Sequence, residues 1–282
     1  MMENRTLPII SAEGLKLIIN NQNVVVIDSS YPKGKQTFKK EHLVGARFVD
    51  LDIDLADIKS DFAHGGRHPL PQVSDFVSVL NDLGISNNTH IIVYDRNTGA
   101  FAARMWWMLR AIGHEKVQVL DGGFDRAKKL GLATDTGDES AVVKSNYSAK
   151  TWLWSISEMA DIEAALISNS QKVIDVRGAE RYRGEVEPID IIAGHIPGAI
   201  NAPFTDNLLA DGTFKSKQEL KDLFSQVLGN GASQDAIFHC GSGVTACHSI
   251  LALDIAGRQI PSLYVGSWSE WSRNYKPITT DM

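Results

Sequence analysis

The feature that most constrains the fold is that the chain of 282 residues contains the same pattern twice. Each half begins with an apolar run ending at an Asp, within Asn23–Ser30 and Gln171–Arg177. Further along, each half has an apolar run, a turn of small residues, a helix-length segment and another apolar run, at His90–Gly123 and Asp235–Ser267. The repeat is roughly 150 residues long, which is too long for a solenoid unit and about the size of one domain.

Strand-length apolar runs that alternate with helix-length segments indicate crossover units, and therefore a mainly parallel sheet flanked by helices in each half. The sequence thus predicts an α/β protein with two tandem domains. We expect an N-terminal domain at 1–135 and a C-terminal domain at 152–282. The polar stretch 136–151 between them is the predicted linker.

The composition, 43% hydrophobic and 22% charged, is that of a globular protein able to bury a full core. A net charge of −6 argues against a general nucleic-acid binder, which would show a basic stripe. No apolar run approaches about 18 residues, so no membrane span is predicted. We expect no secretory signal and a cytoplasmic location, because the start lacks a signal-peptide pattern and two cysteines cannot form a disulfide framework.

Both cysteines lie within His239–Ser249. Cys240 follows a predicted strand at Asp235–His239 and precedes a predicted helix that stops at Gly257, and ligands of open α/β sheets bind at such strand ends. Two glycines in the turn let the backbone point its amides inward, and these amides favour an anion together with the helix dipole. Cys240 is therefore the predicted nucleophile, as a thiolate.

The first half carries Asp95 where the second half carries Cys240. Only the second half therefore offers a nucleophilic sulfur. We expect the N-terminal domain to be non-catalytic and to contribute packing and the shape of the site.

This stretch also has other interpretations. One is that Cys240 is a structural cysteine in a tight turn. A cysteine phosphatase is disfavoured, because it would need an arginine where the chain has Ala246. Cys247 is too far away for a Cys-x-x-Cys redox pair. His239, Cys240, Cys247 and His248 lack the usual spacing of a metal site, so we predict no metal and expect Cys247 and His248 to be packing and helix-surface residues.

Six segments carry a family resemblance: Cys240–Ala246 (CGSGVTA), Gly194–Ala199 (GHIPGA), Arg104–His114 (RMWWMLRAIGH), Leu120–Phe124 (LDGGF), Arg181–Glu185 (RYRGE) and Gly266–Trp271 (GSWSEW). Together they resemble the sulfurtransferases of the tandem-domain rhodanese family, most of all its 3-mercaptopyruvate sulfurtransferases. The resemblance covers nearly the whole chain and implies two rhodanese-like domains, of which the second is catalytic.

The resemblance implies sulfur transfer in two steps. Cys240 attacks the sulfur of 3-mercaptopyruvate and becomes a persulfide while pyruvate leaves, and an acceptor thiol, thioredoxin or cyanide then removes the sulfur. The covalent persulfide is the only intermediate carrier, and no cofactor is expected. Thiosulfate is the alternative donor, and a non-catalytic rhodanese-like module that binds a partner or senses oxidation is the alternative from another class.

The resemblance also implies a relay. Thiosulfate-using relatives carry basic residues at the second and third loop positions, where this chain has the neutral Gly241 and Ser242. In the mercaptopyruvate subfamily the loop Ser is paired with a His and an Asp, which match His68 and Asp52 here. A carboxylate that orients an imidazole, which in turn polarises a hydroxyl, is chemically reasonable. His64 competes with His68 for this role.

Donor binding is assigned by the same resemblance. Arg181 matches the arginine that holds the donor carboxylate, for which a planar fork is suited, and Arg183 is a weaker candidate. The family usually has a second arginine just downstream, where this chain has Ile189 or Asp190. The preference between mercaptopyruvate and thiosulfate therefore stays open. The loop residues predicted to contact the donor are Gly241, Gly243, Val244 and Thr245.

Other conspicuous residues are predicted to be structural. His42 and His195 occur at matching positions of the two halves although only one half has the cysteine. We therefore expect both histidines to hold a turn. Asp175 and Arg177 are interpreted as a structural ion pair, and the tryptophans as packing residues: Trp106, Trp107, Trp268 and Trp271.

Overall fold

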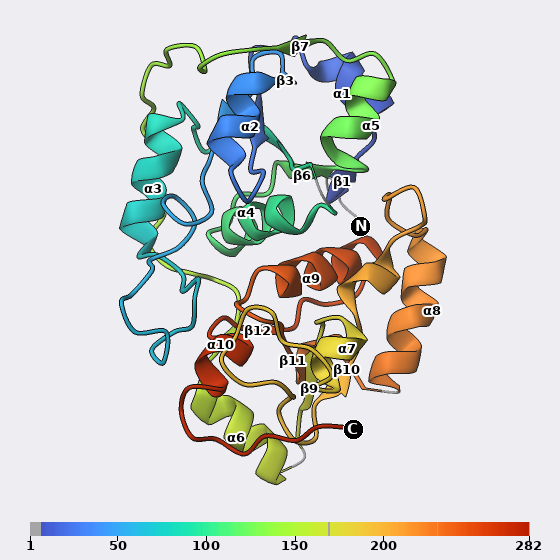
Figure 1. Cartoon of the computed structure of the whole chain (residues 1–282). Helices are drawn as coiled ribbons and strands as arrows, with labels where there is room; N and C mark the ends of the chain where they lie inside the picture. Colours follow the sequence, from blue (N-terminus) through green and yellow to red (C-terminus); the bar gives the residue numbers. More distant parts are fainter. Residues whose placement is uncertain (1–6, 97, 169, 230, 282) are drawn as a thin grey trace. The chain divides into compact units, whose positions relative to one another are not determined.

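Each half of the sequence repeat folds around its own parallel sheet (Figure 1). The computed structural model describes residues 7–96, 98–168, 170–229 and 231–281. The chain divides into two compact units. Unit 1 is made of Met1–Ala56, Pro71–Leu153 and Ala210–Thr213, and unit 2 is made of Asp57–Leu70, Trp154–Leu209 and Phe214–Met282.

The sheet of unit 1 has five strands in the order β1-β6-β5-β2-β4, and every neighbouring pair is parallel. A separate antiparallel pair joins β3 and β7. The bounds are β1 (Ile9–Ile10), β2 (Val24–Asp28), β3 (His42–Leu43), β4 (Arg47–Phe48), β5 (His90–Tyr94), β6 (Val117–Leu120) and β7 (Thr134–Asp135).

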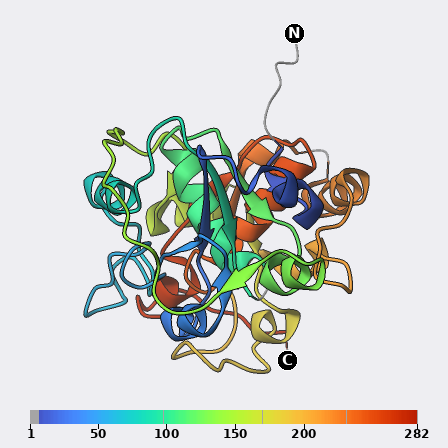
Figure 2. The same cartoon turned by 90° about the horizontal axis from the view of Figure 1, so that it is seen from above.

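Helices cover both faces of this sheet. Helix α4 packs against β5 and β6, and α2 and α5 lie on the opposite face (Figures 1 and 2). The helix α1 begins where the Ser11 hydroxyl accepts a hydrogen bond from the Gly14 amide at 3.1 Å, a typical N-cap. The helices are α1 (Ala12–Ile18), α2 (Gly34–Lys40), α3 (Val73–Asp82), α4 (Ala100–Ala111) and α5 (Gly123–Lys129).

The sheet of unit 2 repeats the topology of unit 1. Its order is β10-β9-β11-β12-β8, again with parallel pairs throughout, so each strand has a counterpart at the same place in the other sheet. The bounds are β8 (Ile156–Ser157), β9 (Lys172–Asp175), β10 (Ile200–Asn201), β11 (Ala236–His239) and β12 (Ser262–Tyr264). The predicted α/β fold with two tandem parallel-sheet domains is therefore confirmed.

The helices of unit 2 also lie around its sheet. A capping box starts α8, in which Ser216 and Glu219 each accept a hydrogen bond from the backbone amide of the other. The bounds are α6 (Met159–Ser168), α7 (Ala179–Tyr182), η1 (Phe204–Asn207), α8 (Lys217–Leu228), η2 (Ser233–Asp235), α9 (Thr245–Ile255) and α10 (Ser267–Trp271).

Helix α9 follows Cys240 as predicted, but it is buried more completely than its sequence pattern indicates. The side chains from Ala246 to Asp254 are all buried. The prediction that His248 lies on the helix surface is therefore wrong, since its ring is fully buried and stacks on Phe214 at 4.6 Å between ring centroids. An apolar pattern identifies one buried face and does not reveal that other faces are covered.

The predicted linker, 136–151, contains no helix or strand. It packs along unit 1, where the Ser145 amide donates to the Asn81 carbonyl at 3.0 Å and Tyr147 is buried. Two short segments lie with the unit that the sequence order would not give them, Asp57–Leu70 with unit 2 and Ala210–Thr213 with unit 1. The domain boundaries therefore remain a prediction.

None of the helices in the described part of the chain combines the length and apolar character that a membrane crossing needs.

The four tryptophans predicted to be packing residues are fully buried, in agreement with that prediction: Trp106, Trp107, Trp268 and Trp271.

Candidate active site

The loop after β11 places Cys240 at the carboxyl end of a central strand, directly before α9. Cys240 is buried, with 1% of its surface exposed. Its carbonyl accepts a hydrogen bond from the Trp268 amide at 3.0 Å, which ties the loop to α10. Gly243 has φ +73°, and a Cβ there would lie 2.8 Å from the Val265 carbonyl oxygen, so this position requires glycine.

The backbone amides of this loop are largely unpaired. The Cys240 amide donates to Ser267 Oγ at 3.2 Å. The next amides, among the residues that the structure describes, donate to no acceptor at Gly241, Ser242, Val244, Thr245 and Ala246. Buried backbone donors nearly always have a partner, and amides at a helix N-terminus favour an anion. The loop is therefore built to hold a negative charge.

The matching loop of unit 1 shows how such an anion is held. Asp95, also 1% exposed, follows β5 as Cys240 follows β11. Its carboxylate accepts hydrogen bonds from the amides of Gly99 at 2.9 Å, Phe101 at 2.9 Å and Ala102 at 3.1 Å. The first half thus satisfies its loop with a carboxylate of its own.

The structure brings the predicted pair His68 and Ser242 together. His68 Nδ1 lies 2.8 Å from Ser242 Oγ, in hydrogen-bond distance. The segment Asp57–Leu70 that carries His68 is held on α10, because the Gly65 amide donates to Glu270 Oε1 at 2.7 Å and the Arg67 amide donates to Ser269 Oγ at 2.8 Å. The hydroxyl of the loop therefore has an imidazole in direct contact.

The remaining candidates for the relay are His64, which competes with His68, and Asp52. The His64 side chain is 80% exposed and pairs with Asp61 at 3.2 Å, so His68 is the histidine at Ser242. Asp52 belongs to unit 1. Burial and the neighbouring Asp50 carboxylate raise the pKa of Asp52, against a hydrogen bond from Tyr31. Its role in the relay stays a prediction.

Arg181, on α7, lies beside the loop as predicted. Its Nη1 and Nη2 are each 3.7 Å from the position that a Cβ on Gly241 would occupy. Arg181 Nη2 and Nε donate to the Glu187 carboxylate at 2.6 and 3.3 Å. Arg183 instead pairs with Glu185 at 2.6 Å, and both side chains are exposed. Arg181 is therefore the better placed of the two predicted arginines.

A second arginine at the loop, Arg67, was not predicted. Its Nη2 lies 3.1 Å from the same Cβ position on Gly241, and its Nη1 forms an ion pair with Asp190. Asp190 is one of the two residues, with Ile189, at the place where the resemblance implied an arginine. It is buried and also pairs with Arg273 at 2.9 Å. The only sequence signal was that Arg67 directly precedes His68.

The Glu187 carboxylate organises this side of the site. Besides Arg181, it accepts hydrogen bonds from the amides of Ile189 and Asp190 at 3.0 Å. Burial alone would raise the pKa of Glu187, but the hydrogen bonds from Arg181 and these amides outweigh it and lower the pKa below its usual value. Glu187 is therefore ionised and fixes the guanidinium of Arg181.

The residues predicted to be structural behave alike in the two halves. His42 Nδ1 donates to the Phe38 carbonyl at 2.8 Å and its ring stacks on Phe38, and His195 does the same with Tyr182 at 2.7 Å. These matching contacts agree with a structural role for both histidines.

A buried charge network lies behind Cys240. Arg177 Nη2 donates to Asp175 Oδ2 at 2.7 Å, in agreement with the predicted structural ion pair. The ring of His239 is fully buried, and its Nδ1 donates to the Cys240 carbonyl at 3.2 Å. Burial lowers the pKa of His239 although Asp175 opposes this, so the ring is neutral.

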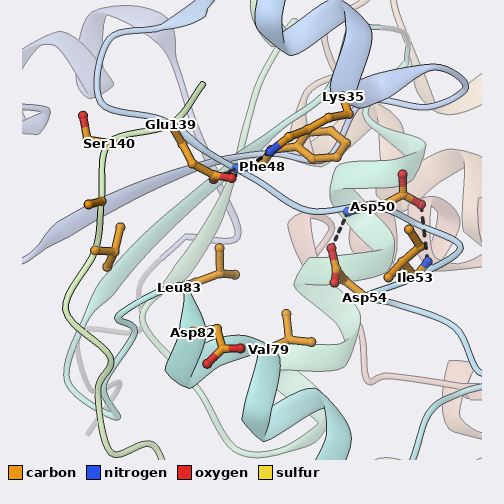
Figure 3. Close-up of a pocket in the computed structure, with 12 residues that line it drawn as sticks. Lys35, Phe48, Asp50, Ile53, Asp54, Val79, Asp82, Leu83, Glu139 and Ser140 are labelled. Carbon is orange, nitrogen blue, oxygen red and sulfur yellow. Dashed lines mark hydrogen bonds and ion pairs between the residues drawn. The ribbon is translucent and has the colours of Figure 1, made fainter. Parts of the chain in front are cut away.

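Within the described residues, no group of three or more His, Cys, Asp or Glu side chains is arranged to hold a metal ion. Unit 1 has a pocket of about 570 Å³ that contains carboxylates (Figure 3). There Glu139 pairs with Lys35 at 2.7 Å and accepts from the Phe48 amide at 2.9 Å, and Asp54 accepts from the Asp50 amide at 2.7 Å. These contacts stabilise the pocket wall, and its lining contains no cysteine or histidine.

Comparison with known proteins gives one family. The profile described as Rhodanese-like domain matches residues 11–129 and 158–274, once in each half. The chain belongs to the rhodanese family. A probable 3-mercaptopyruvate sulfurtransferase of Pseudomonas aeruginosa is 37% identical over 280 residues, which is 96% of this chain and 98% of the relative.

Two further relatives agree. The thiosulfate sulfurtransferase of Mus musculus is 37% identical over 264 residues, which is 90% of this chain and 86% of the relative. The structure of a 3-mercaptopyruvate sulfurtransferase from Leishmania major matches with a TM-score of 0.83 and 28% identity over 97% of this chain and 76% of that one. The predicted rhodanese family and sulfurtransferase class are therefore confirmed.

The loop predicts that an anionic side chain at position 240 stabilises the fold. We expect Cys240→Asp to be more stable than the isosteric neutral Cys240→Asn by about 1–3 kcal/mol, because a carboxylate accepts the loop amides as Asp95 does in unit 1. Urea unfolding at pH 7 measures the difference. Equal stability of the two variants would contradict an anion-binding loop.

The lowered pKa of Glu187 predicts a pH dependence. A carboxyl whose pKa is lower when folded adds stability above its ordinary value near 4.5, and this stability is lost as the pH falls through the folded pKa. Glu187→Gln should therefore lose about 1–3 kcal/mol at pH 7. The difference from wild type should shrink below pH 4.5, as followed by urea unfolding at several pH values.

The exposed Glu185, which pairs with Arg183, supplies the matched control for this experiment. Glu185→Gln should lose much less stability than Glu187→Gln at pH 7. A Glu187→Gln difference that stays constant from pH 7 to pH 4 would show that its carboxylate charge does not matter.

Proposed function

We propose that the protein takes a sulfur atom from 3-mercaptopyruvate onto Cys240 as a persulfide and passes it to an acceptor thiol, thioredoxin or cyanide, with release of pyruvate. The observation that carries this proposal is the buried loop of unpaired amides around Cys240, whose counterpart in unit 1 holds the Asp95 carboxylate. The relatives named 3-mercaptopyruvate sulfurtransferase support the choice of donor.

In the first step the Cys240 thiolate attacks the sulfur of the donor. A sulfur–sulfur bond forms, the carbon–sulfur bond breaks, and its electron pair leaves on carbon as the enolate of pyruvate. One proton then converts the enolate to pyruvate. The step therefore needs a nucleophilic sulfur, a group that supplies a proton, and a binding site for the carboxylate of mercaptopyruvate. It needs no oxidant and no cofactor beyond the covalent persulfide.

The loop geometry suits the persulfide better than the thiolate. Among the described residues, no backbone amide donates to Cys240 Sγ. The outer sulfur of a persulfide is two bonds beyond Cβ, as are the Asp95 carboxylate oxygens that accept three amides in unit 1. By analogy with the Asp95 loop, the amides of the second loop bind the transferred sulfur in this proposal and stabilise it as an anion.

The pair His68 and Ser242 supplies the proton in this proposal. Their 2.8 Å contact lets the imidazole polarise the hydroxyl of Ser242, which belongs to the Cys240 loop. The role of Asp52 as the acid of the relay stays a prediction. Arg181 binds the donor carboxylate, and the amides of Gly241, Gly243, Val244 and Thr245 surround the sulfur.

In the second step the acceptor attacks the outer sulfur of the persulfide. The sulfur–sulfur bond breaks, the acceptor keeps the outer sulfur, and Cys240 returns as a thiolate. This cycle needs Cys240 as a free thiol, which a reducing compartment maintains, so we propose a cytoplasmic location.

Thiosulfate is the second candidate donor. It is favoured by the similarity to the thiosulfate sulfurtransferase of Mus musculus and by Ile189 and Asp190 at the place of an implied arginine. The neutral Gly241 and Ser242 disfavour it, since thiosulfate is a dianion. A non-catalytic module is disfavoured because the second half keeps the cysteine together with its glycine loop.

Steady-state kinetics with mercaptopyruvate and with thiosulfate test the proposal. Cys240→Ser should abolish transfer from both donors, because oxygen does not replace the sulfur nucleophile. His68→Ala should lower kcat with mercaptopyruvate by roughly 10²-fold or more, the usual contribution of a general acid or base.

His64→Ala is the matched control, since it removes an exposed imidazole from the same segment. It should keep the wild-type rate. Full transfer by Cys240→Ser would refute the mechanism, and a higher kcat/KM with thiosulfate would refute the proposed donor. Equal losses in the two histidine variants would refute the relay.

A further inference from the structure

We infer that Arg67 is a second ligand of the donor carboxylate, which it holds together with Arg181, and that Asp190 positions it. This inference rests on the proposed function, since it names the group that recognises the donor. Arg67 thus takes the place of the second arginine that the resemblance implies, although it lies more than a hundred residues upstream of that position and reaches it through its ion pair with Asp190.

The geometry brings two guanidinium groups to one point. A Cβ on Gly241 would lie 3.1 Å from Arg67 Nη2 and 3.7 Å from both terminal nitrogens of Arg181. Gly241 is the residue directly after Cys240, so both cations lie beside the loop that carries the reacting sulfur. Because Gly241 has no side chain, both guanidinium groups can approach the backbone of the loop this closely.

Each guanidinium keeps a terminal nitrogen available there. Arg67 uses Nη1 for Asp190, and Arg181 uses Nε and Nη2 for Glu187. In the described part of the chain, Arg67 Nη2 and Arg181 Nη1 make no hydrogen bond. The two side chains are 15% and 18% exposed, so a small molecule can reach them.

The charge balance of this cluster favours an added anion. The cluster consists of four arginines and three buried carboxylates that pair with one another: Arg67, Arg177, Arg181, Arg273, Asp175, Glu187 and Asp190. One positive charge is left over, and it lies where the free nitrogens converge. A carboxylate has two oxygens and accepts hydrogen bonds from two guanidinium groups at once, with the strength of charge-assisted bonds.

Asp190 holds Arg67 in place where the resemblance implies a different arginine. A buried aspartate beside a donor carboxylate would repel it, but Asp190 is neutralised by Arg67 and by Arg273, the latter at 2.9 Å. The ion pair fixes one side of the Arg67 guanidinium and turns the other side toward Gly241. Asp190 is therefore a positioning residue, and Arg67 supplies the contact.

The test is steady-state kinetics of Arg67→Gln with mercaptopyruvate. We expect KM to rise roughly 10- to 100-fold, the effect of losing one hydrogen bond to a charged group, while kcat changes less than about threefold. Inhibition by the product pyruvate should weaken by a similar factor. Inhibition by methyl pyruvate, which lacks the carboxylate, should be the same in variant and wild type.

Arg258→Gln is the matched control, because it makes the same change at an arginine that binds the Lys221 carbonyl and the Ser225 hydroxyl of α8. It should keep the wild-type KM. Arg67→Lys keeps the ion pair with Asp190 but loses the planar fork, so its KM should rise by an intermediate factor. This variant decides the question if Arg67→Gln does not fold by circular dichroism.

An unchanged KM in both Arg67 variants would overturn the inference, even with Cys240→Ser inactive. A fall in kcat with constant KM would also overturn it, because Arg67 would then act on the chemical step. If wild type does not turn over mercaptopyruvate, the proposed function fails instead, and calorimetric binding of pyruvate to wild type and Arg67→Gln still tests Arg67 separately.

Discussion

Backbone amides in a loop between a parallel strand and a helix are stabilised by a negative charge, and this chain has two such loops. In unit 1 the Asp95 carboxylate accepts three of these amides and is itself part of the chain. In unit 2 the same place is taken by Cys240, whose side chain is one bond shorter and carries charge only on sulfur. The duplicated fold therefore contains one loop whose amides bind a carboxylate of the chain and one loop whose anion, in the proposed mechanism, is the transferred sulfur.

The side chains around the Cys240 loop also favour a negative charge. Arg67 and Arg181 lie beside the loop, where positive charge favours both an anionic sulfur and an anionic donor. Ser242 and His68 add a hydroxyl and an imidazole in direct contact, and the proposed mechanism uses this pair as its proton donor. Unit 1 has a carboxylate in place of the cysteine, so the proposed chemistry belongs to unit 2 alone.

Local sequence was enough to predict the repeat, the two sheets and the Cys240 loop, because each depends on short motifs in a duplicated pattern. The pairing of Ser242 with His68 was predicted only through the resemblance to a family, since the two residues lie 174 positions apart in sequence. Arg67 was missed because its segment reaches the site through contacts such as that between Gly65 and Glu270, 205 residues apart in sequence. His248 was misplaced since burial around a whole helix depends on the tertiary fold.

Whether the loop holds a transferred sulfur on Cys240 can be measured by peptide mass spectrometry after exposure of the protein to mercaptopyruvate, without an acceptor and under non-reducing conditions. We expect a mass increase of one sulfur atom on the peptide that contains Cys240, reversed by an added thiol and absent from Cys240→Ser. Release of pyruvate by wild type with no added sulfur on that peptide, or with the sulfur on Cys247, would contradict it.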